Sequence, residues 1–318
     1  MNFRAVSIAA IAGAVLSFAG ALQAQKRVPA PLPSGQGSPS SPIRAEVTRV
    51  NMLFTVTDKK GRFVTNLTKN DFQVFEDKKL QTILQFTSES DLPLRMAILI
   101  DTSNSIRERL HFQQQAAINF INGVMRDQDK ATVISFDTSV EPATSLTGNT
   151  ARLEDAIRNL RAGGGTALYD GIYFACKELM RDQPLYKFRR AMVILSDGED
   201  NASRHSRDQA LEMAQRADVV IYTISTNTSG LETDGDKVMR FFAQSTGGVV
   251  FFPFQAKDLD QSFTNIANEL RHQYNIFYQP QPLHNDGKFH RVKIRVKGRK
   301  HLIVRCRKGY YASKEPSS

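Results

Sequence analysis

The sequence Ile98-Leu-Ile-Asp-Thr-Ser-Asn-Ser105 joins an apolar run to one carboxylate and two hydroxyls. The apolar part predicts a strand that is buried on both faces, as in a parallel sheet. Residues that directly follow such a strand lie at its carboxyl end, where open α/β sheets bind ligands. Asp101, Ser103 and Ser105 offer only hard oxygen donors there, which suit Mg²⁺ or Mn²⁺ and do not suit zinc.

Two later segments supply further oxygen donors. Gly163-Gly-Gly-Thr166 places a hydroxyl after a glycine turn, where the backbone can come close to an ion. The segment Arg190–Gly198 repeats the first pattern, since an apolar run ends in Asp197. Three loops therefore deliver a predicted set of metal ligands, which consists of Asp101, Ser103, Ser105, Thr166 and Asp197.

Each of these pieces also has a purely structural explanation. Ser103 and Ser105 are candidates for N-caps of the helix that follows, and Thr166 for the cap of a helix that starts at Ala167. Asp197-Gly198 can be a plain turn. The occurrence of all five donors in this order favours a metal site, or the relic of one, over separate coincidences. A relic would usually have lost a type of ligand, and none is lost here.

The segment from Leu94 to His272 alternates between strand and helix patterns, which predicts a doubly wound, mostly parallel sheet flanked by helices. Expected strands span 94–100, 131–136, 191–195, 219–224 and 249–252. Expected helices span 106–125, 151–160, 168–180, 207–217, 237–244 and 259–270.

The pattern Asp-x-Ser-x-Ser at 101–105, followed by Thr166 and Asp197, resembles the metal-ion-dependent adhesion site of von Willebrand factor A-type domains. The resemblance covers residues 91–272 and implies a six-stranded, Rossmann-like sheet. It also implies that Val140–Leu146 is a short antiparallel edge strand of that sheet.

The same resemblance assigns roles to the five donors. The hydroxyls of the two serines and the threonine would contact the ion. The two aspartates would bind it directly or through water. A position would remain for an Asp or Glu carboxylate of a protein partner.

The segments on either side of this domain, 44–90 and 273–313, have strand patterns. Neither is long enough for a stable sandwich, so we expect one small β-sandwich built from both flanks, with the α/β domain inserted between its strands. Leu302–Cys306 is expected to pair back on the preceding strand as a hairpin. Phe54-x-Val-x-Asp and the terminal Arg-Lys-Gly-Tyr-Tyr resemble the flanks of an exported bacterial family related to A-type domains.

The amino terminus has the pattern of a secretory signal peptide. Arg4 precedes an apolar run, Ala5–Phe18, that is short for a membrane span of about 20 residues. Cleavage after Ala24 is favoured and Ala21 is the alternative; an uncleaved anchor is the competing interpretation. We therefore expect a secreted or periplasmic protein with no transmembrane span after cleavage. The expected division is signal peptide 1–24, Pro/Ser/Gly linker 25–43, sandwich 44–90, A-type domain 91–272, sandwich 273–313 and tail 314–318.

The chain has 318 residues and a net charge of +10, and no acidic residue lies between Lys288 and Lys308. These basic strands can bind an anionic cell-surface polymer. The alternative, which the strict alternation favours, is a solvated strand face whose charges discourage aggregation. Export disfavours nucleic-acid binding. Cys176 and Cys306 are expected to be separate buried thiols, and a disulfide between them is the less favoured alternative.

These patterns predict an exported protein that mediates divalent-cation-dependent protein binding or adhesion. A scaffold subunit of an envelope complex, without true adhesion, is the alternative. A hydrolase is the least favoured class, because the sequence has no Gly-x-Ser-x-Gly elbow and no phosphate-binding loop. His205 alone lies near a predicted ligand loop, so we expect no enzyme activity.

Overall fold

The structure is a computed structural model that describes residues 49–88, 92–181, 188–227, 229–253, 256–299 and 301–313. All of these residues belong to one compact unit, Val47–Ser318. The predicted signal peptide, linker and tail lie outside the described residues.

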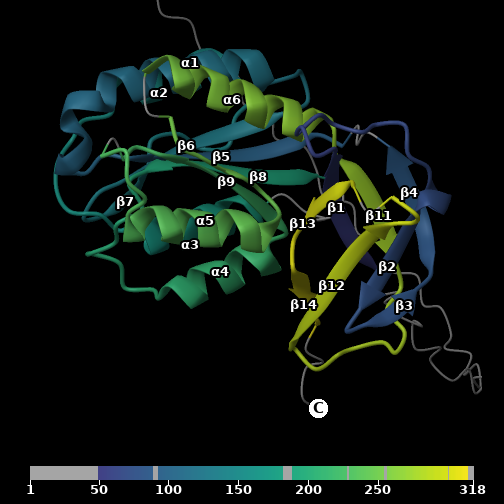
Figure 1. Cartoon of the computed structure of the whole chain (residues 1–318). Helices are drawn as coiled ribbons and strands as arrows, with labels where there is room; N and C mark the ends of the chain where they lie inside the picture. The colour runs from purple at the N-terminus through teal and green to yellow at the C-terminus, as the bar shows by residue number, and fades with distance from the viewer. Residues whose placement is uncertain are drawn as a thin grey trace, which may run out of the picture. The chain divides into compact units, whose positions relative to one another are not determined.

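A six-stranded sheet forms the centre of the α/β part, in the order β10-β9-β8-β5-β6-β7 (Figure 1). All neighbouring strands are parallel except β7, which pairs with β6 in the antiparallel direction. This arrangement confirms the predicted doubly wound, mostly parallel sheet. The strands are β5 Leu94–Asp101, β6 Lys130–Phe136, β7 Val140–Pro142, β8 Arg189–Ser196, β9 Val219–Ser225 and β10 Val250–Phe251.

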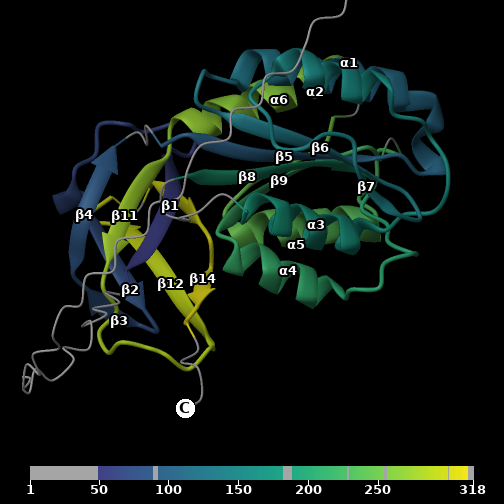
Figure 2. The same cartoon turned by 180° about the vertical axis from the view of Figure 1, so that it is seen from behind.

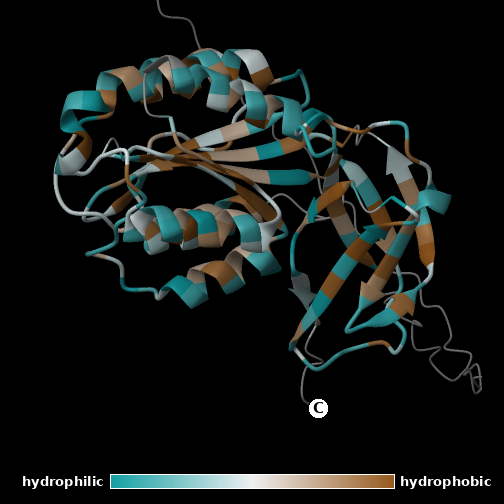
Figure 3. Cartoon of the chain, in the orientation of Figure 1, coloured by the Kyte–Doolittle hydropathy of each residue, from teal (hydrophilic) through white to brown (hydrophobic). Residues whose placement is uncertain are grey.

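Helices cover both faces of this sheet (Figures 1 and 2). One core lies under α1, α2 and α6, and the other lies under α3, α4 and α5. Every residue of β5 and β8 is buried as a result, and between their polar ends both strands are hydrophobic (Figure 3). The helices are α1 Leu110–Val124, α2 Thr150–Arg158, α3 Leu168–Leu179, α4 Arg207–Arg216, α5 Asp234–Thr246 and α6 Ala256–Arg271.

The α-helix that was expected to start at Ile106 begins four residues later. Residues Asn104–Arg109 form a 3₁₀ helix, η2, and the α-helix begins only at Leu110. The backbone N–H of Ile106 bonds the carbonyl of Ser103, three residues back, which is the 3₁₀ pattern.

The two flanks form a sandwich of two four-stranded sheets, in the orders β13-β1-β11-β4 and β14-β12-β2-β3. Both sheets mix strands from before and after the α/β part, which confirms the predicted sandwich. The first flank supplies β1 Val50–Thr57, the 3₁₀ helix η1 Lys69–Asp71, β2 Phe72–Glu76, β3 Lys79–Gln81 and β4 Ile83–Ser88. The second supplies β11 Tyr274–Tyr278, β12 Phe289–Val296, β13 Ile303–Cys306 and β14 Gly309–Tyr311.

The predicted hairpin between β12 and residues 302–306 is wrong. Strand β13 pairs with β1 in the opposite sheet, with Cys306 opposite Phe54 and Ile303 opposite Thr57. Strand β12 instead pairs with β2 along residues 292–296 and with β14 along residues 289–291. The chain therefore crosses to the second sheet after β12 and returns with β14.

An aromatic cluster joins the two flanks inside the sandwich. The rings of Phe54, Phe72 and Phe86 all lie within 5.6 Å of the Tyr274 ring, measured between centroids. The Tyr274 hydroxyl donates to the Val64 carbonyl at 2.8 Å and accepts from the Leu67 N–H at 3.1 Å. One residue of the second flank therefore organises much of the first.

Both cysteines are free thiols in the structure. Cys176 lies on the buried face of α3, in the core of the α/β part, while Cys306 packs against the sandwich core. Within the described residues, no helix is both long enough and apolar enough to cross a membrane.

The sandwich should fold without the inserted α/β part, because Ser88 and Tyr274 are opposite each other in neighbouring strands. We expect a shortened chain, with a short Gly/Ser loop in place of residues 89–273, to show near-ultraviolet circular dichroism and a cooperative thermal transition. Adding Phe54→Ala should lower its stability by about 3–5 kcal/mol. A shortened chain without a cooperative transition would contradict this interpretation.

Candidate functional site

Asp101 is the last residue of β5, and its side chain is fully buried. One carboxylate oxygen accepts the Ser103 N–H at 2.8 Å, and the other accepts the Ser196 hydroxyl at 2.6 Å. Burial raises the pKa of Asp101 to about 6, although the hydrogen bonds from Ser196 and Ser103 oppose the shift. In the described part of the chain, no lysine or arginine pairs with this carboxylate.

A chain of hydrogen bonds runs from Ser103 to Asp197. The hydroxyl oxygens of Ser103 and Ser105 are 2.9 Å apart, and the Ser105 hydroxyl donates to Asp197 Oδ2 at 2.9 Å. Through the Ser103 N–H, this chain continues to Asp101. The structure therefore brings together four of the five predicted ligands.

Backbone bonds hold Thr166, the fifth predicted ligand, beside the other two loops. The Thr166 N–H donates to the Asn201 side chain at 2.9 Å, and its carbonyl accepts the Asn201 N–H at 2.9 Å. The Gly163 N–H donates to the Thr102 carbonyl at 2.7 Å, which ties the same loop to the end of β5. Among the described residues, no hydrogen bond joins the Thr166 hydroxyl to the other four ligands.

The capping explanations for Ser103 and Thr166 do not hold. Ser103 occupies the N-cap position of η2, but its side chain makes no capping hydrogen bond. The N-cap of α3 is Ala167 and not Thr166. Both hydroxyls are therefore available for another purpose, although each residue is almost completely buried.

Two glycines fix the position of the Asp197 loop. Gly198 has a φ of +81°, and a Cβ atom there would lie 2.1 Å from the Gly235 carbonyl oxygen. A Cβ atom on Gly235 would lie 2.1 Å from the Asp197 carbonyl oxygen. The loop therefore rests directly on the first turn of α5, and only glycine permits this approach.

The sequence reasoning missed Ser196 and Asn201. Ser196 is fully buried between the Asp101 carboxylate, to which it donates, and the Gly198 N–H, from which it accepts at 3.0 Å. The parallel pairing of β5 and β8 could have indicated the role of Ser196. Leu195 is opposite Ile100, and the residues that follow them, Ser196 and Asp101, are both polar. Asn201 gave no comparable signal, because its role depends on the loop conformation.

His205 contacts Asp170 and Tyr173 rather than either of the two serines. Its Nδ1 atom lies 2.6 Å from Asp170 Oδ1, and its ring stacks on Tyr173 with 3.9 Å between centroids. In the described ranges, no histidine is hydrogen-bonded to Ser103 or Ser105. The geometry thus lacks the contact between a nucleophile and a base that a serine hydrolase uses.

The basic face predicted on the last strands is present on β12. Arg291, Lys293 and Arg295 are exposed and alternate with buried Val292 and Ile294. The Arg295 guanidinium also lies over the Phe75 ring, 5.2 Å from its centroid. This regular alternation accounts for the charges as the outer face of a sandwich sheet.

Comparisons with known proteins agree with this architecture. Residues 96–199 match the family model of the von Willebrand factor type A domain. An uncharacterized protein of Borreliella burgdorferi is 30% identical over 144 residues, which cover 42% of this chain and 41% of the relative. The match thus spans less than half the length of that relative.

Of two similar solved structures, the first shares the fold of this chain. The von Willebrand factor type A protein from Catenulispora acidiphila has a TM-score of 0.51 at 14% identity, over 78% of this chain and 76% of that one. The PilB minor pilin from Streptococcus sanguinis has a TM-score of 0.46 at 13% identity, over 57% and 62%. Residues 96–199, in the six-stranded α/β part of this chain, thus match the von Willebrand factor type A domain, and the part as a whole shares its fold.

Proposed function

We propose that this chain binds a protein ligand in a divalent-cation-dependent manner, through Asp101, Ser103, Ser105, Thr166 and Asp197. The observation that carries the proposal is the fully buried carboxylate of Asp101, which has no cationic partner in the described part of the chain. A buried charge is costly unless a counter-charge or a metal ion compensates it.

The donor set fits a hard cation. All five side chains offer oxygen, three as neutral hydroxyls and two as carboxylates. Mg²⁺ prefers oxygen ligands and retains several waters, and Mn²⁺ accepts similar ligands. Four of the five groups already contact one another through hydrogen bonds, and backbone bonds hold Thr166 beside them.

A bound Mg²⁺ would supply Lewis acidity toward a carboxylate oxygen. The chain itself contributes rigidity, because Ser196 holds Asp101 and Gly235 supports the Asp197 loop. The two aspartates compensate a divalent charge only incompletely when water separates them from the ion. An Asp or Glu of a partner protein then adds the missing negative charge, and no covalent bond breaks.

The signal-peptide pattern of residues 1–24 supports a location in the cell envelope or outside the cell. We therefore propose adhesion or protein assembly at that location. An anionic polymer on the basic strands Lys288 to Lys308 remains a prediction, and the alternation of β12 favours a purely solvated face.

Asp101→Asn tests the metal site. We expect wild-type protein to bind Mg²⁺ and Mn²⁺ in calorimetric titrations, and the variant to bind at least about a hundredfold more weakly, because loss of an outer-shell partner alone costs about 10–100-fold. Without metal, the variant should be at least as stable as wild type, since it removes an unpaired buried charge. The matched control is Glu199→Gln, on the exposed part of the Asp197 loop, which should bind normally. A wild-type protein that binds neither ion would contradict the proposal.

Gly235→Ala tests whether loop position matters when all ligands are intact. The added methyl group would displace the Asp197 carbonyl, so we expect Mg²⁺ affinity to fall by at least about tenfold. Gly123→Ala is the control, because a Cβ atom there meets nothing within 4 Å. If both variants bind Mg²⁺ with equal affinity, the contact between α5 and the Asp197 loop is not required for metal binding.

Partner binding is tested with immobilised protein and envelope extract. Retention of a partner should require Mg²⁺, disappear with chelator, return when Mg²⁺ is restored, and be absent for Asp101→Asn. A partner that is retained regardless of chelator and of Asp101→Asn would instead indicate a scaffold role for another surface. Retention by wild type should also weaken when the acidic side chains of the isolated partner are amidated.

A further inference from the structure

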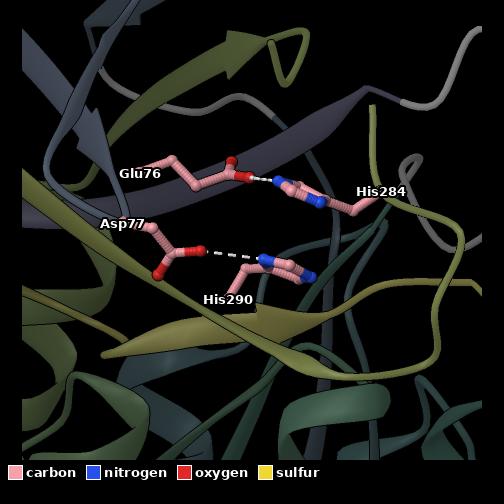
Figure 4. A group of neighbouring side chains, drawn as sticks. All are labelled: Glu76, Asp77, His284 and His290. Atoms are coloured by element: carbon pink, nitrogen blue, oxygen red, sulfur yellow. Dashed lines mark hydrogen bonds and ion pairs between the residues drawn. The ribbon is translucent and has the colours of Figure 1, made fainter. Parts of the chain in front are cut away.

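A second group of metal-binding side chains lies in the sandwich and includes none of the residues assigned above. Glu76 and Asp77 stand at the end of β2, His290 lies in β12, and His284 belongs to the connection between β11 and β12 (Figure 4). One potential ligand atom from each residue lies within 4.8 Å of those from the other three.

The group is arranged as two pairs of a carboxylate and an imidazole, as Figure 4 shows. His284 Nε2 lies 3.4 Å from Glu76 Oε1, and His290 Nδ1 lies 2.9 Å from Asp77 Oδ2. The two imidazole rings stack with 3.8 Å between centroids. In a tetrahedral zinc site with ligands at about 2.0–2.1 Å, adjacent ligand atoms are about 3.3 Å apart. The distance between His284 and Glu76 is close to that spacing, and the distance between His290 and Asp77 is shorter.

Partners that would orient the ligands are also present. His290 Nε2 lies 3.1 Å from Asp286 Oδ1, which leaves Nδ1 directed at the group. A histidine that binds a metal almost always donates its other ring N–H to such a carboxylate or carbonyl. Asp286 is itself fixed, because its Oδ1 atom accepts the Lys288 N–H at 2.9 Å.

Glu76 is held by tyrosines from both sheets. The Tyr278 hydroxyl donates to Oε2 at 2.6 Å, and the Tyr310 hydroxyl donates to Oε1 at 3.1 Å. Burial raises the pKa of both tyrosines, and the Glu76 charge raises it further, so both hydroxyls remain donors. Glu76 is only 2% exposed, and it is thus a preorganised carboxylate that needs a positive charge.

The histidines distinguish a metal ion from a simple ion-pair cluster. Both ring nitrogens of His290 face carboxylate oxygens, which only accept hydrogen bonds, so either a proton or a metal ion at Nδ1 satisfies Asp77. The stacked rings would repel each other if both carried a proton. A metal ion bound at Nδ1 preserves the hydrogen bond from Nε2 to Asp286 and neutralises the carboxylates together.

We propose that Glu76, Asp77, His284 and His290 bind a transition-metal ion such as Zn²⁺. Imidazole ligands favour zinc and its neighbours over Mg²⁺, which prefers oxygen alone. Such an ion would fasten the connection between β11 and β12 to the end of β2, and so join the two flanks of the sandwich.

The test is a calorimetric titration of Zn²⁺ into the full chain in excess Mg²⁺, which occupies the oxygen site of the A-type domain. We expect one zinc ion per wild-type chain. His284→Ala should weaken binding by at least about a hundredfold and Asp286→Asn by about 10–100-fold. The His284 side chain is 24% exposed, so its loss should leave the circular dichroism spectrum unchanged. Zinc should raise the Tm of wild type and not that of His284→Ala.

Two variants distinguish this site from other possibilities. His205→Ala removes a different pair of histidine and aspartate and should bind zinc like wild type. Asp101→Asn should also retain zinc binding, whether or not the A-type domain binds Mg²⁺. The proposal is overturned if wild type binds no zinc, if His284→Ala binds like wild type, or if Asp101→Asn abolishes the binding.

Discussion

The buried end of β5 is the constraint on which the candidate site depends. Strand β5 lies between β6 and β8, and helices cover both of its faces, so Asp101 has no access to solvent. Its carboxylate accepts hydrogen bonds from the Ser103 N–H and from the Ser196 hydroxyl, which approaches from β8. The other two loops are held against this point by backbone bonds, so the position of one side chain organises three loops.

The sandwich has its own inward-pointing carboxylate. Burial alternates along β2, and Glu76 occupies the same face as Phe72 and Val74. Its tyrosine partners come from opposite sheets, so the acid lies where both flanks meet. Because Ser88 and Tyr274 are also opposite each other, the inserted domain leaves and re-enters the sandwich at neighbouring positions. The insertion therefore does not require the sandwich to open.

Sequence periodicity predicted the elements whose burial is regular. The two-sided burial of β5 and β8, and the alternation of β12, are visible in the residues themselves. The pairing of β13 was not predictable in this way, because the residues of a short strand do not show which of the two sheets it joins. The group around Glu76 was also missed, since about two hundred residues separate its members. The sequence nevertheless contained a signal for this group. Glu76 is an acidic residue at a position of β2 where the alternating pattern predicts a buried apolar side chain.

The two candidate sites differ in the chemistry of their donors, and this difference separates their roles. The A-type loops offer only oxygen, and three of their donors are neutral, which suits a hard ion that still accepts a carboxylate from outside. The sandwich group combines two imidazoles with two carboxylates, and partners outside the group already hold two of them, since tyrosines bond Glu76 and Asp286 bonds His290. Four protein ligands complete a tetrahedral ion and leave no position for a partner. On these grounds we propose partner recognition for the oxygen site and a structural role, joining the two flanks, for the group around Glu76.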